Sequence, residues 1–289
     1  MVRSTVLLDE LQAYGSGLEK SESFVFRCSS EIIPTRSYPE ISKSLHRYSF
    51  FLPYAMERSN TFFELIRHSK IIDAQIVARS ILDSLAKTWI CCIGNATEDE
   101  EIEKELRRLF YFEFRRNRSK FEAVDRNASL FGKESSLSKI SHTEKAFGEK
   151  LSSGSSSRTK NFFEFSRIAG RAEKFLEPFN IKLPTDEFKF SYNLLSSFVH
   201  GSGAALFEFN QNIEELVAYG HVTDRLNATG TIFSVVAAWY YTHAIYHLSV
   251  YGQRGNFSEL HSSFKEIYDL LLPIADRQTR EFSKTMQGL

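Results

Sequence analysis

The chain has 289 residues, with 36 Lys and Arg balanced by 36 Asp and Glu. Because the charges balance, no global field draws the molecule onto nucleic acid or an anionic membrane, and any such affinity needs a local patch. The length is sufficient for one large or two modest hydrophobic cores, as in an ordinary globular protein.

Cysteine usage and the N-terminal residues indicate the compartment. Cys28 and the adjacent Cys91 and Cys92 make an odd count, and neighbouring cysteines rarely pair with each other. This pattern is typical of a reducing environment. Asp9 and Glu10 precede any apolar run that could serve as the core of a signal peptide. We therefore expect no export and a cytoplasmic location.

The first part of the chain is predicted to be helical, because apolar residues recur at helical spacing and strand alternation is scarce. A short amphipathic helix is expected over residues 6–14, followed by an irregular stretch to Tyr38. Two further helices are expected to begin at Pro39 and Pro53, since proline is favoured in the first turn of a helix.

Residues 70–94 predict a helix at the centre of the bundle, because they are apolar on most sides, and Gly94 is expected to end it. A long exposed helix should follow, with Thr97 as its cap and acidic residues in its first turns, where they suit the helix dipole. It contains a basic cluster interleaved with aromatic residues, which comprises Arg107, Arg108, Arg115, Arg116, Arg118 and Lys120. Arg115 and Arg116 are candidate RNA-binding residues, and a solvated amphipathic face is the simpler alternative.

The middle of the chain changes character. Residues 128–158 are crowded with Ser, Lys and Gly, which predicts a mobile excursion. A helix is expected over residues 161–179, and after Pro184 another should run up to Gly201. A short β-hairpin is expected near 205–222.

Residues 226–253 contain no Asp, Glu, Lys or Arg, so they are long and apolar enough to be a membrane candidate. Their Thr, Ser, Tyr and His content favours a buried central helix instead. A last helix is expected over residues 257–278. The prediction is an all-α multi-helix bundle forming one composite domain, with an N-terminal helix and irregular arm (1–37), a first half (38–127), a mobile Ser-rich excursion (128–158) and a second half (159–289).

Tyr192, Ser196 and His200 are spaced four apart, so they share one face of a helix. His200 lies where the helix should end, because Gly201 and Gly203 permit a C-cap with positive φ. One interpretation is a capping histidine. The other is a general acid/base, with Tyr192 and Ser196 as substrate ligands.

Arg79 and Asp83 form a second polar stripe on the predicted central helix. A guanidinium in so apolar a segment is costly unless it is paired, and Asp83 is placed to pair with it. Two buried polar stripes on two central helices would satisfy each other most readily. We therefore expect the stripes to face each other and form one pocket.

These motifs resemble a known family. Arg79, Ser80 and Asp83, then an aromatic-rich helix, then Tyr192, Leu195, Ser196 and His200 resemble the bacterial domain-of-unknown-function family 5677 over about residues 72–251. In that family the acidic position is usually Glu, whereas this chain has Asp83. The resemblance implies a helical protein distantly similar to HEPN ribonucleases of toxin and phage-defence loci, which cleave RNA without a metal.

Two weaker motifs involve other histidines. Arg254 and His261 match the Arg-to-His spacing of HEPN ribonucleases, but such a match is expected by chance in this composition. His243 and His247 are four apart, without an HExxH pattern or an obvious third ligand, so core histidines are the expected interpretation. No metal and no cofactor is therefore predicted.

The sequence predicts a component of a bacterial antiphage-defence or toxin-like system, acting as a metal-independent endoribonuclease. In that mechanism His200 is the acid/base and Arg79 contacts the phosphate, with Asp83 beside it. The alternative is a non-enzymatic module for protein interaction or small-ligand binding. The expected partners are RNA, a protein from the same locus and, given 26 phenylalanines, a second copy in a homodimer. No membrane partner is expected.

Overall fold

The computed structural model describes residues 2–32, 51–97, 100–102, 104–106, 108–109, 159, 161–200, 228–252 and 257–287. Every element in these ranges is helical, so the predicted all-α class is confirmed. The elements are α1 (Val2–Ile32), α3 (Phe51–Arg67), α4 (Ile71–Thr97), α8 (Phe165–Leu176), the 3-10 turn η1 (Glu177–Phe179), α9 (Thr185–Val199), α12 (Thr229–Tyr251) and α13 (Phe257–Gln287). The expected hairpin, the Ser-rich excursion and the helix from Pro39 lie outside the described residues.

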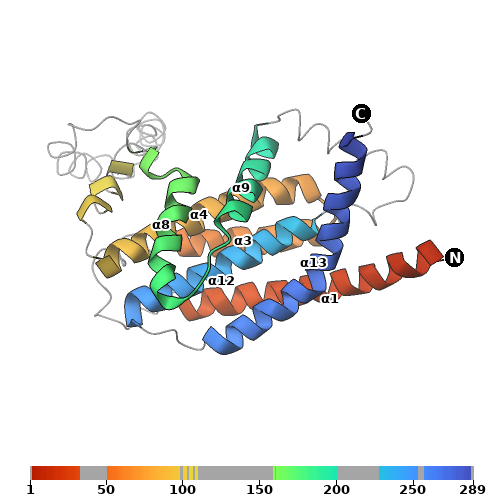
Figure 1. The fold of residues 1–289 in the computed structure, drawn as a ribbon, viewed down its shortest axis with the longest axis horizontal. Helices are drawn as coiled ribbons and strands as arrows, with labels where there is room; N and C mark the ends of the chain where they lie inside the picture. The colour runs from red at the N-terminus through yellow and green to blue at the C-terminus, as the bar shows by residue number, and fades with distance from the viewer. Residues whose placement is uncertain are drawn as a thin grey trace, which may run out of the picture.

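Four long helices, α1, α3, α4 and α12, lie along the long axis of the molecule, and α8 and α9 cross them (Figure 1). α12 contacts α1, α4 and α13, while α3 packs along α4. The last helix, α13, changes direction along its length (Figure 1). Pro273 lies inside it, and an internal proline removes a backbone hydrogen bond and bends a helix.

The uncharged segment forms the buried centre of the bundle, as predicted. Most side chains of α12 from Thr229 to Leu248 are buried. Its Trp239 Nε1 donates to Ser59 Oγ at 2.9 Å, and Trp89 Nε1 of α4 donates to Thr242 Oγ1 at 2.6 Å. These bonds satisfy both buried indoles while tying α12 to α3 and α4. In the described part of the chain, no helix has the length and apolarity needed to cross a membrane.

The predicted break after Tyr14 is wrong, because α1 continues without interruption to Ile32. Gly15 and Gly17 lie just after the predicted break, yet both are inside the helix. A Cβ on Gly17 would lie 2.5 Å from Leu271 Cδ2, so this glycine permits close packing of α1 on α13. The glycine at position 17 is therefore explained by a tertiary contact and not by a turn.

The predicted end of α4 at Gly94 is also wrong, since the helix runs through to Thr97. A Cβ on Gly94 would lie 2.6 Å from Ile102 Cγ2, so this glycine too lies at a close contact. Thr97 is the last residue of α4, and its hydroxyl donates back to Ile93 O at 2.9 Å. Thr97 therefore ends one helix rather than opening the next.

The helical segment after α4 is not simply exposed. Glu105, Arg108 and Thr159 are all buried. Arg108 Nη1 donates to Glu105 Oε1, and Thr159 Oγ1 donates to Glu105 Oε2 at 2.7 Å. Arg108 is thus part of an internal ion pair and not of a solvent-facing basic surface. Arg115 and Arg116 lie outside the described residues.

Candidate functional site

The two polar stripes meet where α9 packs across α4. Tyr192 contacts Arg79 and Asp83. One turn earlier on α9, Phe188 packs edge-on against Trp89, which is farther along α4, with ring centroids 5.7 Å apart. These contacts fix where α9 crosses α4, and the contact expected between the stripes is present at Tyr192.

The Tyr192 ring is the centre of this contact. The Arg79 guanidinium lies over it, with Cζ 3.5 Å from the ring centroid, and Nη2 donates to the Tyr192 hydroxyl. That hydroxyl donates to Asp83 Oδ1 at 3.4 Å. Phe165 of α8 stacks on the ring, with centroids 4.2 Å apart and planes 13° from parallel. Cation–π attraction and stacking together fix the ring between three helices.

Lys87 joins the same group. Its Nζ lies 2.8 Å from Asp83 Oδ2, and Arg79 Nη1 lies 3.6 Å from Asp83 Oδ1. The three side chains are 18% to 32% exposed, so solvent reaches them in part. We call Arg79, Asp83, Lys87 and Tyr192 the Tyr192 cluster. It contains two cations and one carboxylate.

A further acid that acts on Tyr192 does not cancel the charge of the Tyr192 cluster. Glu164 acts electrostatically on Tyr192. Its Oε2, however, is paired with Arg167 Nε at 3.5 Å. Because this pair is neutral as a whole, the described part of the cluster keeps an excess of one positive charge at a half-buried position.

The protonation of Tyr192 limits what the cluster can do. Burial, followed by the nearby Asp83 carboxylate, raises the pKa of the Tyr192 hydroxyl well above its ordinary value, and Arg79 opposes this only in part. The hydroxyl is therefore protonated at neutral pH. It acts as a hydrogen-bond donor and an orienting group, not as a base.

The other two members of the predicted triad lie farther along α9. Ser196 is half-buried, and its carbonyl accepts from the backbone N–H of His200 at 3.2 Å. His200 is the C-cap residue of α9 and is exposed. At 1.5 Å per residue, it lies about 12 Å along the helix axis from Tyr192. No contact among the described residues brings it to Arg79.

Sequence reasoning missed two members of this site. Lys87 follows Asp83 by four residues on α4, which is the same spacing that links Arg79 to Asp83, so this signal was available. Phe165 gives no such signal, because its place on the Tyr192 ring depends on how α8 packs across α4 and α9.

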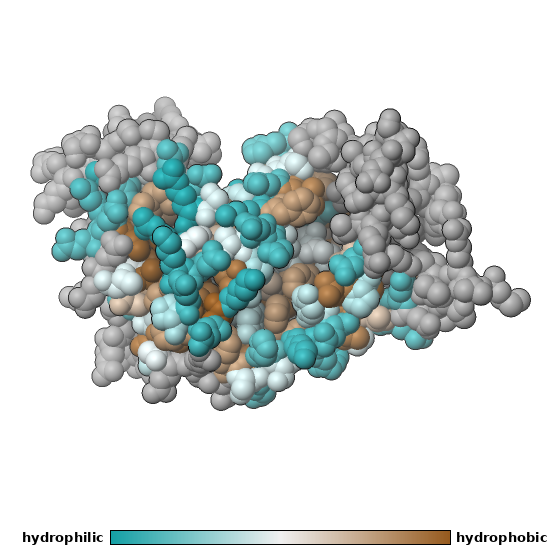
Figure 2. Space-filling view, in the orientation of Figure 1, coloured by the Kyte–Doolittle hydropathy of each residue, from teal (hydrophilic) through white to brown (hydrophobic). Residues whose placement is uncertain are grey.

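The outer face of α9 exposes apolar side chains. Phe190 is 69% exposed, and Leu194, four residues later, is also exposed and shares its face. Val199 is exposed as well, but it lies on a different side at the end of the helix. Figure 2 shows apolar surface in the region of α9 among hydrophilic neighbours. Such a surface is typical of a protein contact.

A second polar group joins α1 to α12. Glu31, His243 and His247 each offer a ligand atom, and these atoms all lie within 4.8 Å of one another. Glu31 Oε2 and His243 Nε2 are 2.6 Å apart, and the two imidazole centroids are 4.2 Å apart. The sequence alone offered no third ligand beside His243 and His247, and the structure shows that Glu31 supplies one. It was missed because α1 was not expected to extend that far.

Both imidazoles of this group are neutral at neutral pH. Burial lowers the pKa of His243, although its hydrogen bond to Glu31 opposes the shift. Burial and the neighbouring His243 lower the pKa of His247 to about 4. A neutral imidazole keeps the lone pair with which histidine binds metals.

Of Arg254 and His261, which have the spacing found in HEPN ribonucleases, only His261 is among the described residues. His261 Nδ1 lies 2.8 Å from the Tyr240 hydroxyl, so this histidine has a partner within the bundle. Arg254 lies outside the described residues, and nothing here links the two.

The family model described as "Family of unknown function (DUF5677)" matches residues 48–215. This is more than half of the chain, so the chain belongs to that family. The match includes Arg79, Asp83, Lys87 and Tyr192 and excludes Glu31, His243 and His247. No curated protein and no solved structure matches the chain.

Proposed function

We propose that this member of the DUF5677 family is a cytoplasmic helical module of a bacterial defence or toxin-like system, and that its Tyr192 cluster binds a phosphate group of RNA or of a nucleotide. One observation carries the proposal. Arg79 and Lys87 share the single carboxylate of Asp83 at a position that solvent reaches. A phosphate oxygen would complete the charge balance and accept hydrogen bonds from both cations.

Binding is favoured over cleavage because the one carboxylate of the cluster, Asp83, is already engaged by Arg79, Lys87 and the Tyr192 hydroxyl. Metal-independent RNA cleavage needs a group that removes the proton of the 2′-hydroxyl. The raised pKa of Tyr192 keeps its hydroxyl protonated. The histidine assigned to this step, His200, is about 12 Å away along α9. The geometry therefore supports the non-enzymatic alternative better than the ribonuclease.

A protein partner is part of the same proposal. The exposed apolar residues Phe190 and Leu194 on α9 give a second copy, or a protein from the same locus, an apolar surface to contact. This surface is on the helix that supplies Tyr192. Partner binding and ligand binding would thus involve one element.

The test is the growth of a bacterial host expressing the protein, with and without phage challenge. We compare wild type with Lys87→Ala and, as a matched control, Lys189→Ala, since Lys189 also pairs with an aspartate, Asp186, at 3.5 Å. Protection or growth inhibition should be present in wild type and in the control and lost in Lys87→Ala. The amount of soluble protein in the host is measured in parallel, and circular dichroism of the purified variants checks that they are folded.

Two results would count against this assignment. A wild type with no effect on growth or infection contradicts a defence or toxin role, and an unchanged Lys87→Ala variant removes the Tyr192 cluster from it. If instead purified protein cleaves RNA and His200→Ala abolishes cleavage without loss of stability, the ribonuclease replaces the binding module. Little loss of stability is expected in that variant because His200 is exposed.

A further inference from the structure

We propose that Glu31, His243 and His247 form a binding site for a divalent transition-metal ion, and that Zn²⁺ suits its donors best. Two imidazoles and a carboxylate are the donor set of known zinc sites, in which a water completes the coordination. The three candidate donor atoms lie within 4.8 Å of one another. A tetrahedral zinc site would hold them about 3.3 Å apart, so only small side-chain movements are needed.

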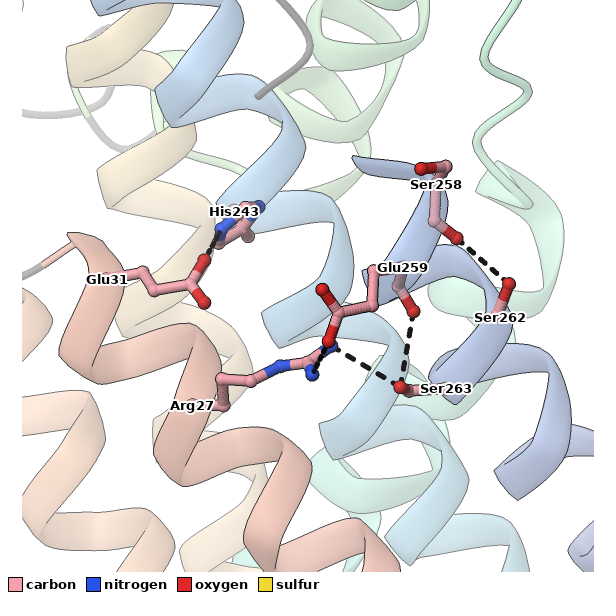
Figure 3. A network of polar contacts seen from close by, with 7 residues as sticks. All are labelled: Arg27, Glu31, His243, Ser258, Glu259, Ser262 and Ser263. Carbon is pink, nitrogen blue, oxygen red and sulfur yellow. Dashed lines mark hydrogen bonds and ion pairs between the residues drawn. The ribbon is translucent and has the colours of Figure 1, made fainter. Parts of the chain in front are cut away.

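The fold places these three residues together for identifiable reasons. His243 and His247 are one turn apart on α12 and therefore share a face, which they turn toward α1. Glu31 is in the last turn of α1. Figure 3 shows Glu31 and His243 pointing toward each other from the two helices.

Arg27, the cation one turn before Glu31, is directed elsewhere. It donates to Glu259 Oε1 at 3.0 Å and to Ser263 Oγ at 3.3 Å. In Figure 3 its side chain extends toward α13, away from Glu31. Arg27 therefore does not compete with the two histidines for the Glu31 carboxylate.

An unpartnered nitrogen is an independent observation in favour of a ligand. His247 Nε2 is buried without a hydrogen-bond partner among the described residues. His243 turns its Nε2 toward Glu31, so an ion beside Glu31 would bind that nitrogen and not the Nδ1 on the other side of the ring. Buried polar atoms nearly always have a partner, so the His247 nitrogen needs an explanation. A bound ion explains why two imidazoles are kept beside a carboxylate here.

The surroundings indicate what the ion would do. Glu31 is 38% exposed, so an ion can enter from the surface. His243 is followed by Ala244, whereas zinc proteases of the HExxH type have the general-base glutamate at that position. The ion would therefore have a structural role, in which it holds the end of α1 against α12, and would not activate water for hydrolysis.

The test is Zn²⁺ titration of the full-length, metal-stripped protein by isothermal calorimetry, with Co²⁺ absorption as a second readout of coordination. Wild type should bind one ion per chain. Glu31→Gln and His247→Ala should each weaken binding by about 10-fold or more, since each removes one of three ligands. His68→Ala is the matched control, because its side chain is 73% exposed and belongs to no such group, and its affinity should equal that of wild type.

Either of two results overturns the proposal: absence of stoichiometric binding to folded wild type, or affinity in Glu31→Gln equal to that in the His68→Ala control. Glu31→Gln decides the matter even if His247→Ala fails to fold. Its glutamine has the size of glutamate and lies at a partly exposed position, so folding is expected to persist. Zn²⁺ should also raise the melting temperature of wild type more than that of Glu31→Gln.

Discussion

Glu105 and Arg108 form an ion pair that is removed from water, with the Thr159 hydroxyl as a further donor. Replacing Arg108 with Met removes the cation that this residue supplies to the buried Glu105 carboxylate. We expect Arg108→Met to lower the free energy of unfolding by about 3–5 kcal/mol, as measured by urea denaturation. In the double variant Glu105→Met with Arg108→Met, most of this loss should be recovered, because the buried carboxylate is removed together with the cation.

The control for this prediction is Arg167→Met, which removes a similar bridge at the surface. Arg167 and Glu164 are both well exposed, and such pairs contribute about 0–1 kcal/mol. A loss in Arg108→Met no larger than in Arg167→Met would mean that the Glu105–Arg108 pair is solvated and that the segment after α4 is not packed as described.

At the scale of elements, α1 contains a matched pair of glycines. Among the described residues, nothing lies within 4 Å of a Cβ on Gly15, whereas one on Gly17 would lie 2.5 Å from Leu271 Cδ2. Gly15→Ala should stabilise the protein by about 0.5–1 kcal/mol, because alanine favours the helix. Gly17→Ala should destabilise it by about 1–3 kcal/mol despite the same gain, because it overpacks the contact with α13. Thermal unfolding of both variants measures the difference, and equal effects would contradict the close packing of α1 on α13.

The same elements show what the sequence can predict. α12 is recognisable because a long run of apolar residues without any charge has to be buried, and α4 because it is apolar on most sides. The true lengths of α1 and α4 are not recognisable, because a glycine that permits close helix packing looks the same in sequence as one that ends a helix. Local pattern determines the element, and tertiary contact determines its end.

The candidate sites divide in the same way. The meeting of Arg79 and Asp83 with Tyr192 follows from helical spacing and from the cost of burying unpaired polar groups. Glu31 comes to His243 from more than 200 residues away, and only the assembled bundle shows this. The position of His200 at the end of α9 was predictable from the glycines after it, but its distance from Arg79 was not.

At the scale of the whole molecule, the balanced charge means that affinity for a phosphate-bearing ligand has to come from a local source. The Tyr192 cluster is such a source, because two cations share one acid there. The contribution of the cluster can be measured from the dependence of binding affinity on salt concentration. Each phosphate that is neutralised on a single strand releases counterions, and added salt opposes this release. Ligand binding should therefore depend weakly on salt, in proportion to the one phosphate that the cluster neutralises.

The most direct measurement is the fluorescence anisotropy of a short labelled single-stranded RNA as a function of salt, for wild type, Lys87→Ala and the Lys189→Ala control. A plot of log affinity against log salt should have a slope of about −0.7 for wild type and the control and a slope near 0 for Lys87→Ala, with weaker binding in that variant, because without Lys87 the charges of Arg79 and Asp83 cancel. Equal slopes and affinities in all three proteins, or no binding by wild type, would contradict the assignment of the Tyr192 cluster as a phosphate site.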